Sequence, residues 1–230
     1  MRIVALAALL ALLTACAQDY PDDRFVALVH AMKPSVVLIT MRIPPERKKD
    51  GYDEAYGTGV VVASGAWGSD ILTVAHVIAG AWDLHATIDN RTKVPVHVIA
   101  ANNDTDVALL RTPRANLPVQ HLGPQTALGD EIGRDVGLLG YPIPDEFEDE
   151  QLGLATSLTT GRLSSIRNDA IEVTVPIVPG ESGGPIFLVD TGRIIGLADS
   201  RFDDERSIGF AVPIGDLLHF LHKTDRAHGF

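Results

Sequence analysis

Short runs of Val, Ile, Leu and Thr follow one another along most of this chain, separated by Gly, Pro, Asn and Asp. Runs of this length with such punctuation predict β-strands. The predicted strands cover residues 36–41, 59–63, 71–74, 94–99, 107–110, 135–139, 157–166, 170–175, 186–189, 193–197 and 208–212. Because long helical segments do not alternate with these runs, the pattern favours a β-sandwich or β-barrels over a βαβ fold. The 230 residues are enough for two small barrels that share one interface.

Two short helices are expected on either side of this β-rich region. Residues 24–33 carry apolar side chains at helical spacing and are followed by a proline, and a second helix is expected over about 214–224. Two polar segments interrupt the strand pattern: 44–56, which contains adjacent prolines, and 144–151, which contains five carboxylates. We expect both segments to be exposed, solvated loops.

The beginning of the chain has the pattern of an export signal. Arg2 precedes an apolar run over residues 3–13, which is too short to span a bilayer and has the length of a signal-peptide core. The run ends in Leu13-Thr14-Ala15-Cys16, which resembles the lipobox of bacterial lipoproteins. That resemblance implies removal of residues 1–15 and a lipid anchor on both the sulfur and the amine of Cys16. The alternative is a plain secretory signal with a cysteine nearby by chance.

Cys16 is the one cysteine of the sequence, so no intramolecular disulfide can form. Residues 16–23 are then expected to be a tether between the membrane and the folded domain, which would occupy 24–230. Ala17 after the cysteine favours the outer membrane, because inner-membrane retention is associated with Asp at that position. We therefore expect a lipid-anchored protein in the bacterial cell envelope, facing the periplasm.

The charge balance argues against nucleic acid as a partner. The sequence has nineteen Lys and Arg residues and thirty Asp and Glu residues, which gives a formal net charge of −11. Phosphate binding, by contrast, needs clustered cations. His85 and His97 lie in predicted strands, and His219 and His222 share one face of the last predicted helix. Because no further ligand completes a set with that pair, we expect these histidines to be surface or packing residues and predict no metal site.

Three motifs carry chemistry, and they follow one another in the order His, Asp, Ser. They are Leu72-Thr73-Val74-Ala75-His76-Val77, Asp104-Thr105-Asp106-Val107-Ala108-Leu109-Leu110 and Pro179-Gly180-Glu181-Ser182-Gly183-Gly184-Pro185-Ile186. A serine hydroxyl is a poor nucleophile until a neighbouring base takes its proton, and neutral imidazole suits that role. A carboxylate can hold the imidazole in the correct tautomer and stabilise the imidazolium that forms. The motifs therefore predict a catalytic triad of His76, Asp106 and Ser182.

The glycines of the third motif allow a sharp turn at the nucleophile. We expect the main-chain N–H groups of Gly180 and Ser182 to point at one position and form an oxyanion hole for a tetrahedral intermediate. No cofactor is needed for such a reaction, and the expected partner is a protein or peptide substrate. Each motif alone has an ordinary structural explanation as a packed histidine, a turn-forming Asp or a tight glycine turn; their joint occurrence favours catalysis.

These three motifs resemble the signatures of the chymotrypsin clan of trypsin-like serine proteases. Four further stretches resemble the protease domain of its bacterial HtrA/Deg branch: 57–61, 136–142, 158–164 and 208–213. The resemblance extends from about residue 34 to the last predicted helix. It implies an all-β fold of two six-stranded antiparallel barrels, over about 34–120 and 121–212, with the active site between them.

The sequence also departs from the HtrA pattern. HtrA proteases normally carry PDZ domains after the protease domain, and we expect none here; their Asn before the nucleophile is replaced by Glu181. Activation by a freed N-terminal amine, as in the digestive proteases, is not expected if Cys16 is acylated. The site is then expected to be either preformed or ordered by the 44–56 segment.

By the same resemblance, the primary specificity pocket is expected to be mostly apolar. Its predicted lining consists of Pro176, Ile177, Val178, Leu197, Ala198, Asp199 and Gly209. A small or medium aliphatic side chain should therefore precede the scissile bond, provided that the carboxylate of Asp199 points away from the pocket, as we expect.

The main function predicted is a serine endopeptidase of envelope protein quality control or processing. The alternative is a pseudoprotease-like lipoprotein that binds peptides through an unformed oxyanion hole.

Overall fold

The structure, a computed structural model, describes residues 21–47, 53–124, 128–167, 170–199 and 208–228. It separates into two units, residues 1–31 and 32–230. In the first unit the described residues belong to helix α2 (Pro21–Met32), which begins at a proline and confirms the predicted N-terminal helix. The expected signal peptide and the lipidation site at Cys16 lie outside the described residues.

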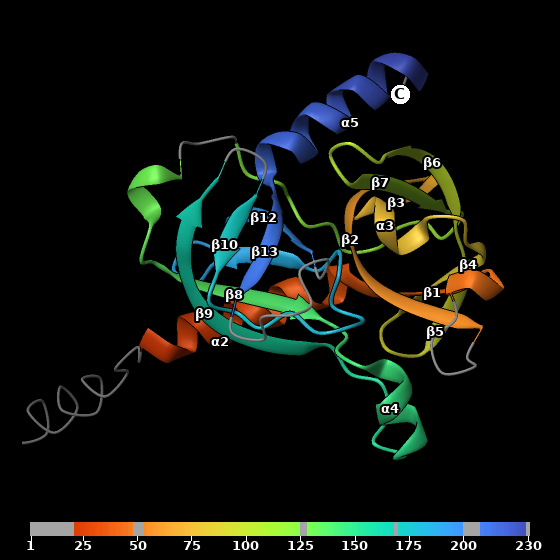
Figure 1. Cartoon of the computed structure of the whole chain (residues 1–230), viewed down its shortest axis with the longest axis horizontal. Helices are drawn as coiled ribbons and strands as arrows, with labels where there is room; N and C mark the ends of the chain where they lie inside the picture. Colours follow the sequence, from red (N-terminus) through yellow and green to blue (C-terminus); the bar gives the residue numbers. More distant parts are fainter. Residues whose placement is uncertain (1–20, 48–52, 125–127, 168–169, 200–207, 229–230) are drawn as a thin grey trace, which may run out of the picture. The chain divides into compact units, whose positions relative to one another are not determined.

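The second unit is built from two β-structures joined in sequence (Figure 1). The N-terminal half is a seven-stranded antiparallel sheet in the order β5-β4-β1-β2-β3-β7-β6. Its strands are β1 (Val36–Arg42), β2 (Glu54–Gly65), β3 (Gly68–Thr73), β4 (Trp82–Ile88), β5 (Thr92–Pro95), β6 (His97–Asn102) and β7 (Val107–Thr112). Short 3₁₀ turns at η1 (Lys33–Ser35) and η2 (Pro45–Arg47) precede and follow β1.

The C-terminal half is a closed six-stranded barrel in the order β10-β13-β12-β11-β8-β9. Its elements are η3 (Gly129–Glu131), β8 (Asp135–Gly140), β9 (Ser157–Ile166), β10 (Ile171–Val173), β11 (Pro185–Leu188), β12 (Ile194–Asp199) and β13 (Gly209–Pro213). Inward side chains from every strand form one apolar core, which includes Leu138, Leu163, Ile186 and Ile195. Closure of this sheet leaves it without a free edge.

The all-β chymotrypsin-like fold expected from the sequence is confirmed, and the differences are local. The described N-terminal sheet has seven strands in an open order, where we expected a six-stranded barrel. The single strand predicted over 94–99 is two strands, because β5 ends at Pro95, which has no N–H for the ladder. Strand β4 contains His85, which was expected to lie in a strand, whereas the one-turn helix α3 (Ala75–Ile78) was not predicted.

The acidic segment 144–151 was expected to be a loop and is instead largely helix α4 (Pro144–Asp149). Pro144 fits the first position of a helix, and Asp145 and Glu146 lie in the first turn, where negative charge is favoured. Figure 1 shows α4 extending away from the barrel strands.

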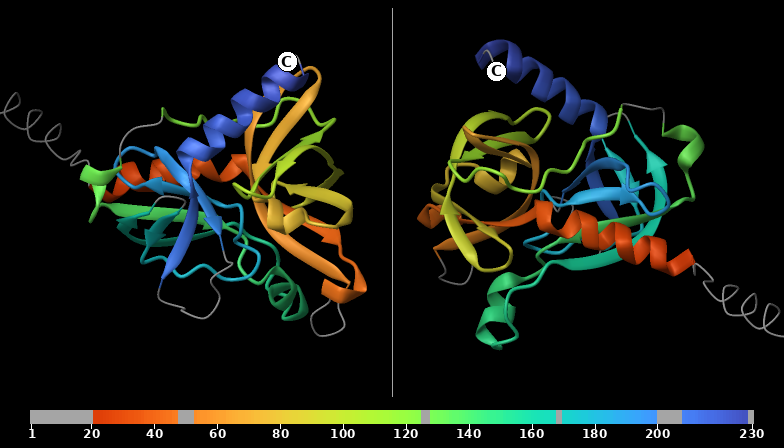
Figure 2. Two further views of the ribbon diagram at one scale, coloured as in Figure 1. Left: turned by 45° about the horizontal axis from the view of Figure 1, so that its top comes forward. Right: turned by 180° about the vertical axis from the view of Figure 1, so that it is seen from behind.

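The final helix, α5 (Ile214–His228), confirms the predicted C-terminal helix and runs beyond residue 224. It contacts β12 and β13 of the barrel and also β7 of the N-terminal sheet. Figure 2 shows it crossing from one half towards the other. None of the described helices is long and apolar enough to cross a membrane.

Candidate active site

His76 and Asp106 are brought together by the N-terminal sheet. His76 lies in α3 directly after β3, and Asp106 lies directly before β7, the strand that pairs with β3. The main-chain N–H of Ala75 donates to the carbonyl of Asp106 over 3.2 Å, which closes the junction. Asp106 has a φ of +53°, a left-handed conformation that Asp tolerates better than most residues.

The carboxylate of Asp106 holds His76 by two hydrogen bonds. Oδ1 accepts from the main-chain N–H of His76 over 2.8 Å, and Oδ2 lies 2.8 Å from Nδ1 of its ring. Asp106 is buried, whereas about a quarter of the His76 side chain (27%) is exposed. With Nδ1 bound to a carboxylate, the nitrogen that can exchange a proton with a substrate-facing group is Nε2.

Gly57 and Gly59, on either side of Thr58 in strand β2, leave room for helix α3 and strand β3. A Cβ on Gly57 would lie 2.5 Å from a methyl group of Val77, and one on Gly59 would lie 2.6 Å from a methyl group of Ile71. Contacts this close are not sterically allowed, so only glycine lets α3 and β3 pack against this part of β2. This is the physical reason for the Gly-Thr-Gly pattern seen in the sequence.

Ser182 lies in a tight turn at the start of β11, pressed against the N-terminal sheet. Its carbonyl accepts from the main-chain N–H of Thr58 over 2.8 Å. A Cβ on Gly183 would lie 2.1 Å from the Thr58 carbonyl and 2.2 Å from Oγ1 of Thr73, three residues before His76. The turn therefore meets the N-terminal sheet where β3 leads into His76.

Thr58 has a second contact with the turn, through its side chain. Its buried Oγ1 donates to the carbonyl of Gly180 over 2.7 Å and accepts from the N–H of Tyr141 over 3.1 Å. Sequence reasoning assigned Thr58 no role. The only available signal was its place between two glycines in a predicted strand.

The peptide between Pro179 and Gly180 has a fixed direction. The Pro179 carbonyl accepts from the N–H of Ile143 over 2.8 Å, and in a trans peptide the N–H of Gly180 points to the opposite side. Gly180 has a φ of +94°, and a Cβ there would lie 2.2 Å from the Tyr141 carbonyl. This position therefore requires glycine.

Glu181 fills the position directly before the serine with a buried carboxylate. Its Oε2 accepts from the N–H of Val178 over 3.0 Å, and its own N–H donates to the Val178 carbonyl over 3.1 Å. Burial raises the pKa of the Glu181 carboxyl above its usual range, and the hydrogen bond from Val178 opposes this in part. The side chain thus closes the turn over residues 178–181 from within.

The residues predicted to line a specificity pocket come from the segment before the serine turn, from β12 and from β13. Leu197, Ala198 and Gly209 are buried on β12 and β13, and Ile177 packs against the barrel core. A Cβ on Gly209 would lie 2.8 Å from Cδ1 of Ile177, so this side chain covers the glycine. Pro176 is exposed and Val178 half-buried.

Asp199 lies elsewhere than we expected. Its carboxylate was expected to point outward, yet it is 4% exposed and its Oδ1 lies 3.9 Å from Nδ1 of His76. Donor atoms of His76, Asp106 and Asp199 all lie within 4.8 Å of one another. The apolar neighbours of Asp199 suggested that direction, and strand alternation could not correct it, because every residue of β12 is buried.

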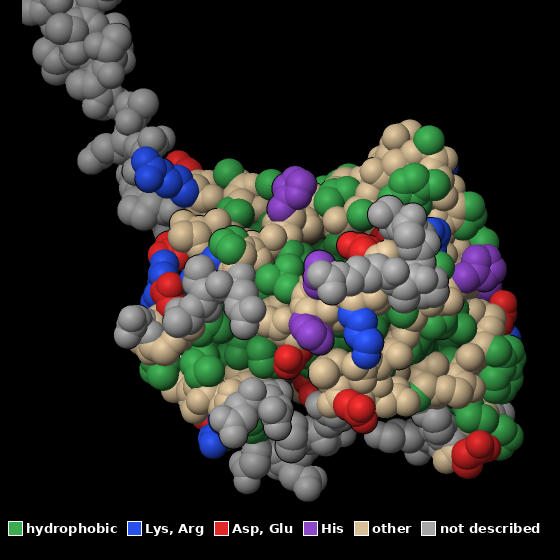
Figure 3. Space-filling view, turned by 90° about the horizontal axis from the view of Figure 1, so that it is seen from above, with side chains coloured by type: hydrophobic (Ala, Val, Ile, Leu, Met, Phe, Trp, Pro, Cys, Tyr) green, Lys and Arg blue, Asp and Glu red, His purple; other side chains and the backbone are tan. Residues whose placement is uncertain are grey.

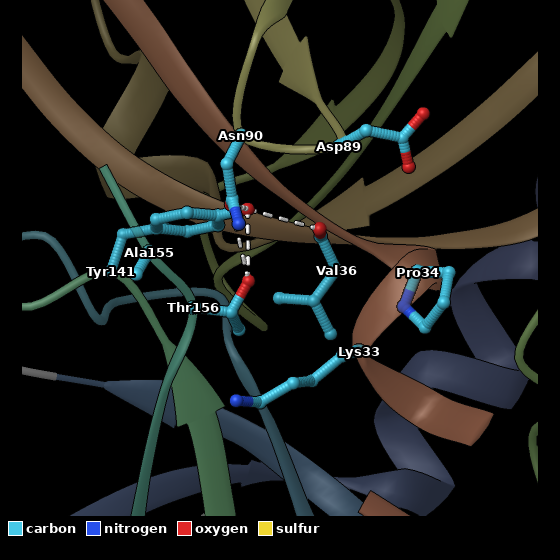
Figure 4. Close-up of a pocket in the computed structure, with 8 residues that line it drawn as sticks. All are labelled: Lys33, Pro34, Val36, Asp89, Asn90, Tyr141, Ala155 and Thr156. Atoms are coloured by element: carbon cyan, nitrogen blue, oxygen red, sulfur yellow. Dashed lines mark hydrogen bonds between the residues drawn. The ribbon is translucent and has the colours of Figure 1, made fainter. Parts of the chain in front are cut away.

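A separate cavity of about 330 Å³ lies on another part of the junction between the two halves (Figure 4). The Tyr141 hydroxyl there lies 2.7 Å from Oδ1 of Asn90 and 3.3 Å from the Val36 carbonyl, and it accepts from Thr156 over 3.0 Å. Burial raises the pKa of Tyr141. The main-chain N–H of Tyr141 also donates to Thr58. This network therefore fixes the chain directly after β8, where Tyr141 lies.

The face drawn in Figure 3 carries histidine, acidic and hydrophobic side chains side by side. The described Lys and Arg side chains on that face are scattered and form no continuous patch.

The molecule has two β-halves. One half carries a His–Asp pair, and a serine turn of the other half packs against the first. This arrangement defines the chymotrypsin-like class of protein. A profile of the family described as Trypsin-like peptidase domain matches residues 57–197, and the chain belongs to this family. The resemblance to the protease domain of the HtrA/Deg branch is also confirmed.

Two curated relatives illustrate this. A probable periplasmic serine endoprotease, DegP-like, of Halomonas elongata is 30% identical over an alignment of 251 positions, gaps included, that covers 90% of this chain and 50% of the relative. The putative serine protease HhoB of Synechocystis is 30% identical over 184 residues, 75% of this chain and 40% of the relative. The chain thus spans about half, or less, of the length of these relatives.

Solved structures agree on the fold. The serine endoprotease from Yersinia pestis superposes with a TM-score of 0.69 at 24% identity, over 88% of this chain and 66% of the other. The Rv3671c protease from M. tuberculosis, in its active form, superposes with a TM-score of 0.71 at 24% identity, over 89% and 87%.

Proposed function

We propose that this chain is a serine endopeptidase in which Ser182 is the nucleophile, His76 the general base and Asp106 the residue that orients His76. The observation that carries the proposal is the double hydrogen bond from His76 to the carboxylate of Asp106. It holds both the main chain and the ring of the histidine, and it supports a tautomer with the proton on Nδ1. Nε2 is then the atom that takes the proton of Ser182.

In the proposed reaction Oγ of Ser182 attacks the carbonyl carbon of a peptide bond while its proton passes to Nε2 of His76. The tetrahedral intermediate collapses when the C–N bond breaks and the leaving amine takes that proton from His76. A water molecule then loses a proton to His76 and attacks the acyl-enzyme ester, which releases the second product and restores the serine. Asp106 stays ionised throughout and stabilises the imidazolium.

The N–H groups of Gly180 and Ser182 are proposed to stabilise the oxyanion. The direction of the Pro179–Gly180 peptide supports this, because its carbonyl is bound to Ile143 and its N–H points to the other side. The N–H groups of Glu181, Gly183 and Gly184 each donate to a main-chain carbonyl, so they are unsuited to this role. These bonds favour a preformed hole over the unformed hole of a pseudoprotease-like peptide receptor.

A small aliphatic residue is proposed to precede the scissile bond. The side chain of Ile177 lies against Gly209. It therefore leaves little depth there for the side chain of a substrate residue. Burying an Arg or Lys side chain beside such apolar groups would strip its hydration. Discrimination among aliphatic residues should be modest, because one methylene group is worth about 1–3 kcal/mol. Profiling the cleavage of a denatured proteome by mass spectrometry tests this, and a dominant Arg or Lys signal would contradict it.

We also propose an envelope location with a lipid anchor on Cys16. Because residues 21–23 of the expected tether (16–23) belong to α2, we propose residues 16–20 as the tether, followed by the folded part of the peptidase. The DegP-like relatives are named as probable periplasmic serine endoproteases, which supports the compartment. Protein quality control or processing there is the role that we propose. Intact-mass measurement of the detergent-extracted protein tests the anchor, because a Cys16→Ser variant should lack the acylated form and an unmodified wild type would refute it.

The Ser182→Ala variant tests the proposed chemistry. Turnover of an unfolded protein substrate should fall roughly a million-fold, as expected when the nucleophile of a triad is removed, while the melting temperature stays close to that of the wild type. Wild-type-like hydrolysis by purified Ser182→Ala protein would refute the assignment. If the protein were a peptide receptor instead, the wild type would bind the substrate without Ser182-dependent cleavage.

A further inference from the structure

A second buried carboxylate faces the proposed catalytic histidine. Oδ2 of Asp106 lies 2.8 Å from Nδ1 of His76, and Oδ1 of Asp199 lies 3.9 Å from the same nitrogen. Both aspartate side chains are 4% exposed. They come from different halves, since Asp106 precedes β7 of the N-terminal sheet and Asp199 ends β12 of the barrel.

The strand that carries Asp199 is bonded to the nucleophile turn. The carbonyl of Ala198 accepts from the N–H of Gly183 over 2.8 Å. The N–H of Ala198 donates to the carbonyl of Gly184, also over 2.8 Å. One residue further on, the Asp199 main chain pairs with Phe210 of β13. The position of the Asp199 carboxylate relative to His76 is therefore set by the same backbone that sets Ser182.

Two negative charges this close repel each other when they are buried, and a positive charge between them relieves that repulsion. His76 becomes positive when it takes the proton of Ser182. The nearest donor atoms of His76 and of these two carboxylates all lie within 4.8 Å of one another.

We propose that Asp199 is a positioning residue for His76, whose charge favours the imidazolium that forms as Ser182 attacks. This inference rests on the proposed function, because it concerns the same reaction. Asp199 touches neither substrate nor the reacting serine in this account; it acts through the ring of His76. It also ties the base, which belongs to one half, to the strand that holds the nucleophile in the other.

The role of the charge can be separated from the role of the shape by two substitutions in the full chain. Asp199→Asn keeps the shape and removes the charge, and Asp199→Glu keeps the charge and changes the shape. Asp199→Asn should lower kcat by roughly ten- to a hundred-fold with KM nearly unchanged. Asp199→Glu should retain more activity than Asp199→Asn. Asp135→Asn, at a residue that is 62% exposed on β8, is the control for net charge and should leave kcat unchanged.

A kcat for Asp199→Asn within twofold of the wild type, or higher than that of Asp199→Glu, would overturn the inference. If the wild type hydrolysed substrate no faster than Ser182→Ala, the proposed function would fail instead. An NMR measurement tests the role of Asp199 even if the protein does not hydrolyse substrate. The proton on Nδ1 of His76, bound to a carboxylate, gives a signal far downfield. Loss of this signal in Asp106→Asn identifies it. This signal should move in Asp199→Asn and stay in place in Asp135→Asn. An unmoved signal would refute the contact, and melting temperatures show which variants fold.

Discussion

The two halves of the molecule hold their proposed catalytic groups in different ways. In the N-terminal half, His76 is fixed by one side chain, the carboxylate of Asp106, through two hydrogen bonds of 2.8 Å. In the C-terminal half, the turn around Ser182 is fixed mainly by its main chain, through bonds from Gly183 and Gly184 and a left-handed Gly180. Thr58 of the N-terminal sheet joins the two halves by one main-chain bond, to Ser182, and by two side-chain bonds, to Gly180 and from Tyr141.

This difference predicts what each half tolerates. The base depends on the chemical identity of an acceptor, so a change that keeps its shape and alters its charge should still be damaging. The nucleophile turn depends on space and on main-chain geometry, so its supports should act through stability and alignment. Substitutions in the two halves should therefore separate activity from stability.

The largest effect among the supporting residues is expected at Asp106. Asp106→Asn keeps the size of the side chain, but its amide can donate a hydrogen bond to Nδ1 and so favours the wrong tautomer of His76. We expect kcat to fall about ten-thousand-fold, with the melting temperature little changed. Steady-state kinetics on a peptide substrate measure this, and a loss smaller than tenfold would show that the base does not depend on the carboxylate.

A smaller effect is expected at Thr58, which links the halves. Thr58→Val leaves the carbonyl of Gly180 and the N–H of Tyr141 buried without their hydroxyl partner. Stability should fall by about 1–3 kcal/mol, and kcat by about tenfold, because Gly180 is less firmly held. Chemical denaturation and kinetics measure the two quantities.

Thr40 on β1 is the matched control for Thr58. Its hydroxyl is buried and has no hydrogen-bond partner in the described structure. Thr40→Val should therefore change stability by less than about 0.5 kcal/mol, or increase it. Equal losses in the two variants would mean that the bonds of Thr58 have no special role.

The smallest effect on activity, with a clear dependence on pH, is expected at Glu181. Its pKa is raised in the folded protein by burial, so its contribution to stability is present at low pH and lost as pH rises through the folded pKa. Glu181→Gln keeps an acceptor for Val178 without the charge. The variant should be more stable than the wild type at neutral pH, and the difference should disappear below about pH 4, the ordinary range for Glu.

Glu131 offers a control of opposite sign for that pH series. The guanidinium of Arg134, with that of Arg193, lowers the pKa of the Glu131 carboxyl. Glu131→Gln should therefore destabilise the protein at neutral pH, with the difference lost on acidification. Melting temperatures across pH 3–8 compare the two variants, and parallel curves would contradict the buried-charge explanation for Glu181.

The sequence predicted the β-rich fold and both end helices, because strand periodicity, prolines and glycines act locally. It also named His76, Asp106 and Ser182, because each stands in a short motif. It could not predict α3, since one helical turn within an apolar run has no period of its own. The side of β12 that Asp199 occupies was equally hidden, because a strand buried on both faces shows no alternation.

Long-range contacts were the other limit. Thr58 and Gly180 are 122 positions apart, and nothing local marks their hydrogen bond. Tyr56 is a similar case: its pKa is raised by burial and by the carboxylates of Glu54, Asp145 and Glu148, which places the acidic helix α4 near the start of β2. The sequence showed the acidic run and could not show what lies beside it.

The central claim is that Ser182 is an activated nucleophile beside a preformed oxyanion hole. Reaction of the full chain with a fluorophosphonate, followed by peptide mass spectrometry, tests it most directly, because this reagent labels only serines that a base and an oxyanion hole activate. The account predicts one phosphonylated peptide, containing Ser182, with labelling abolished in Ser182→Ala and strongly slowed in Asp106→Asn. Absence of labelling in the folded wild type, or a label on another residue that persists in Ser182→Ala, would contradict it.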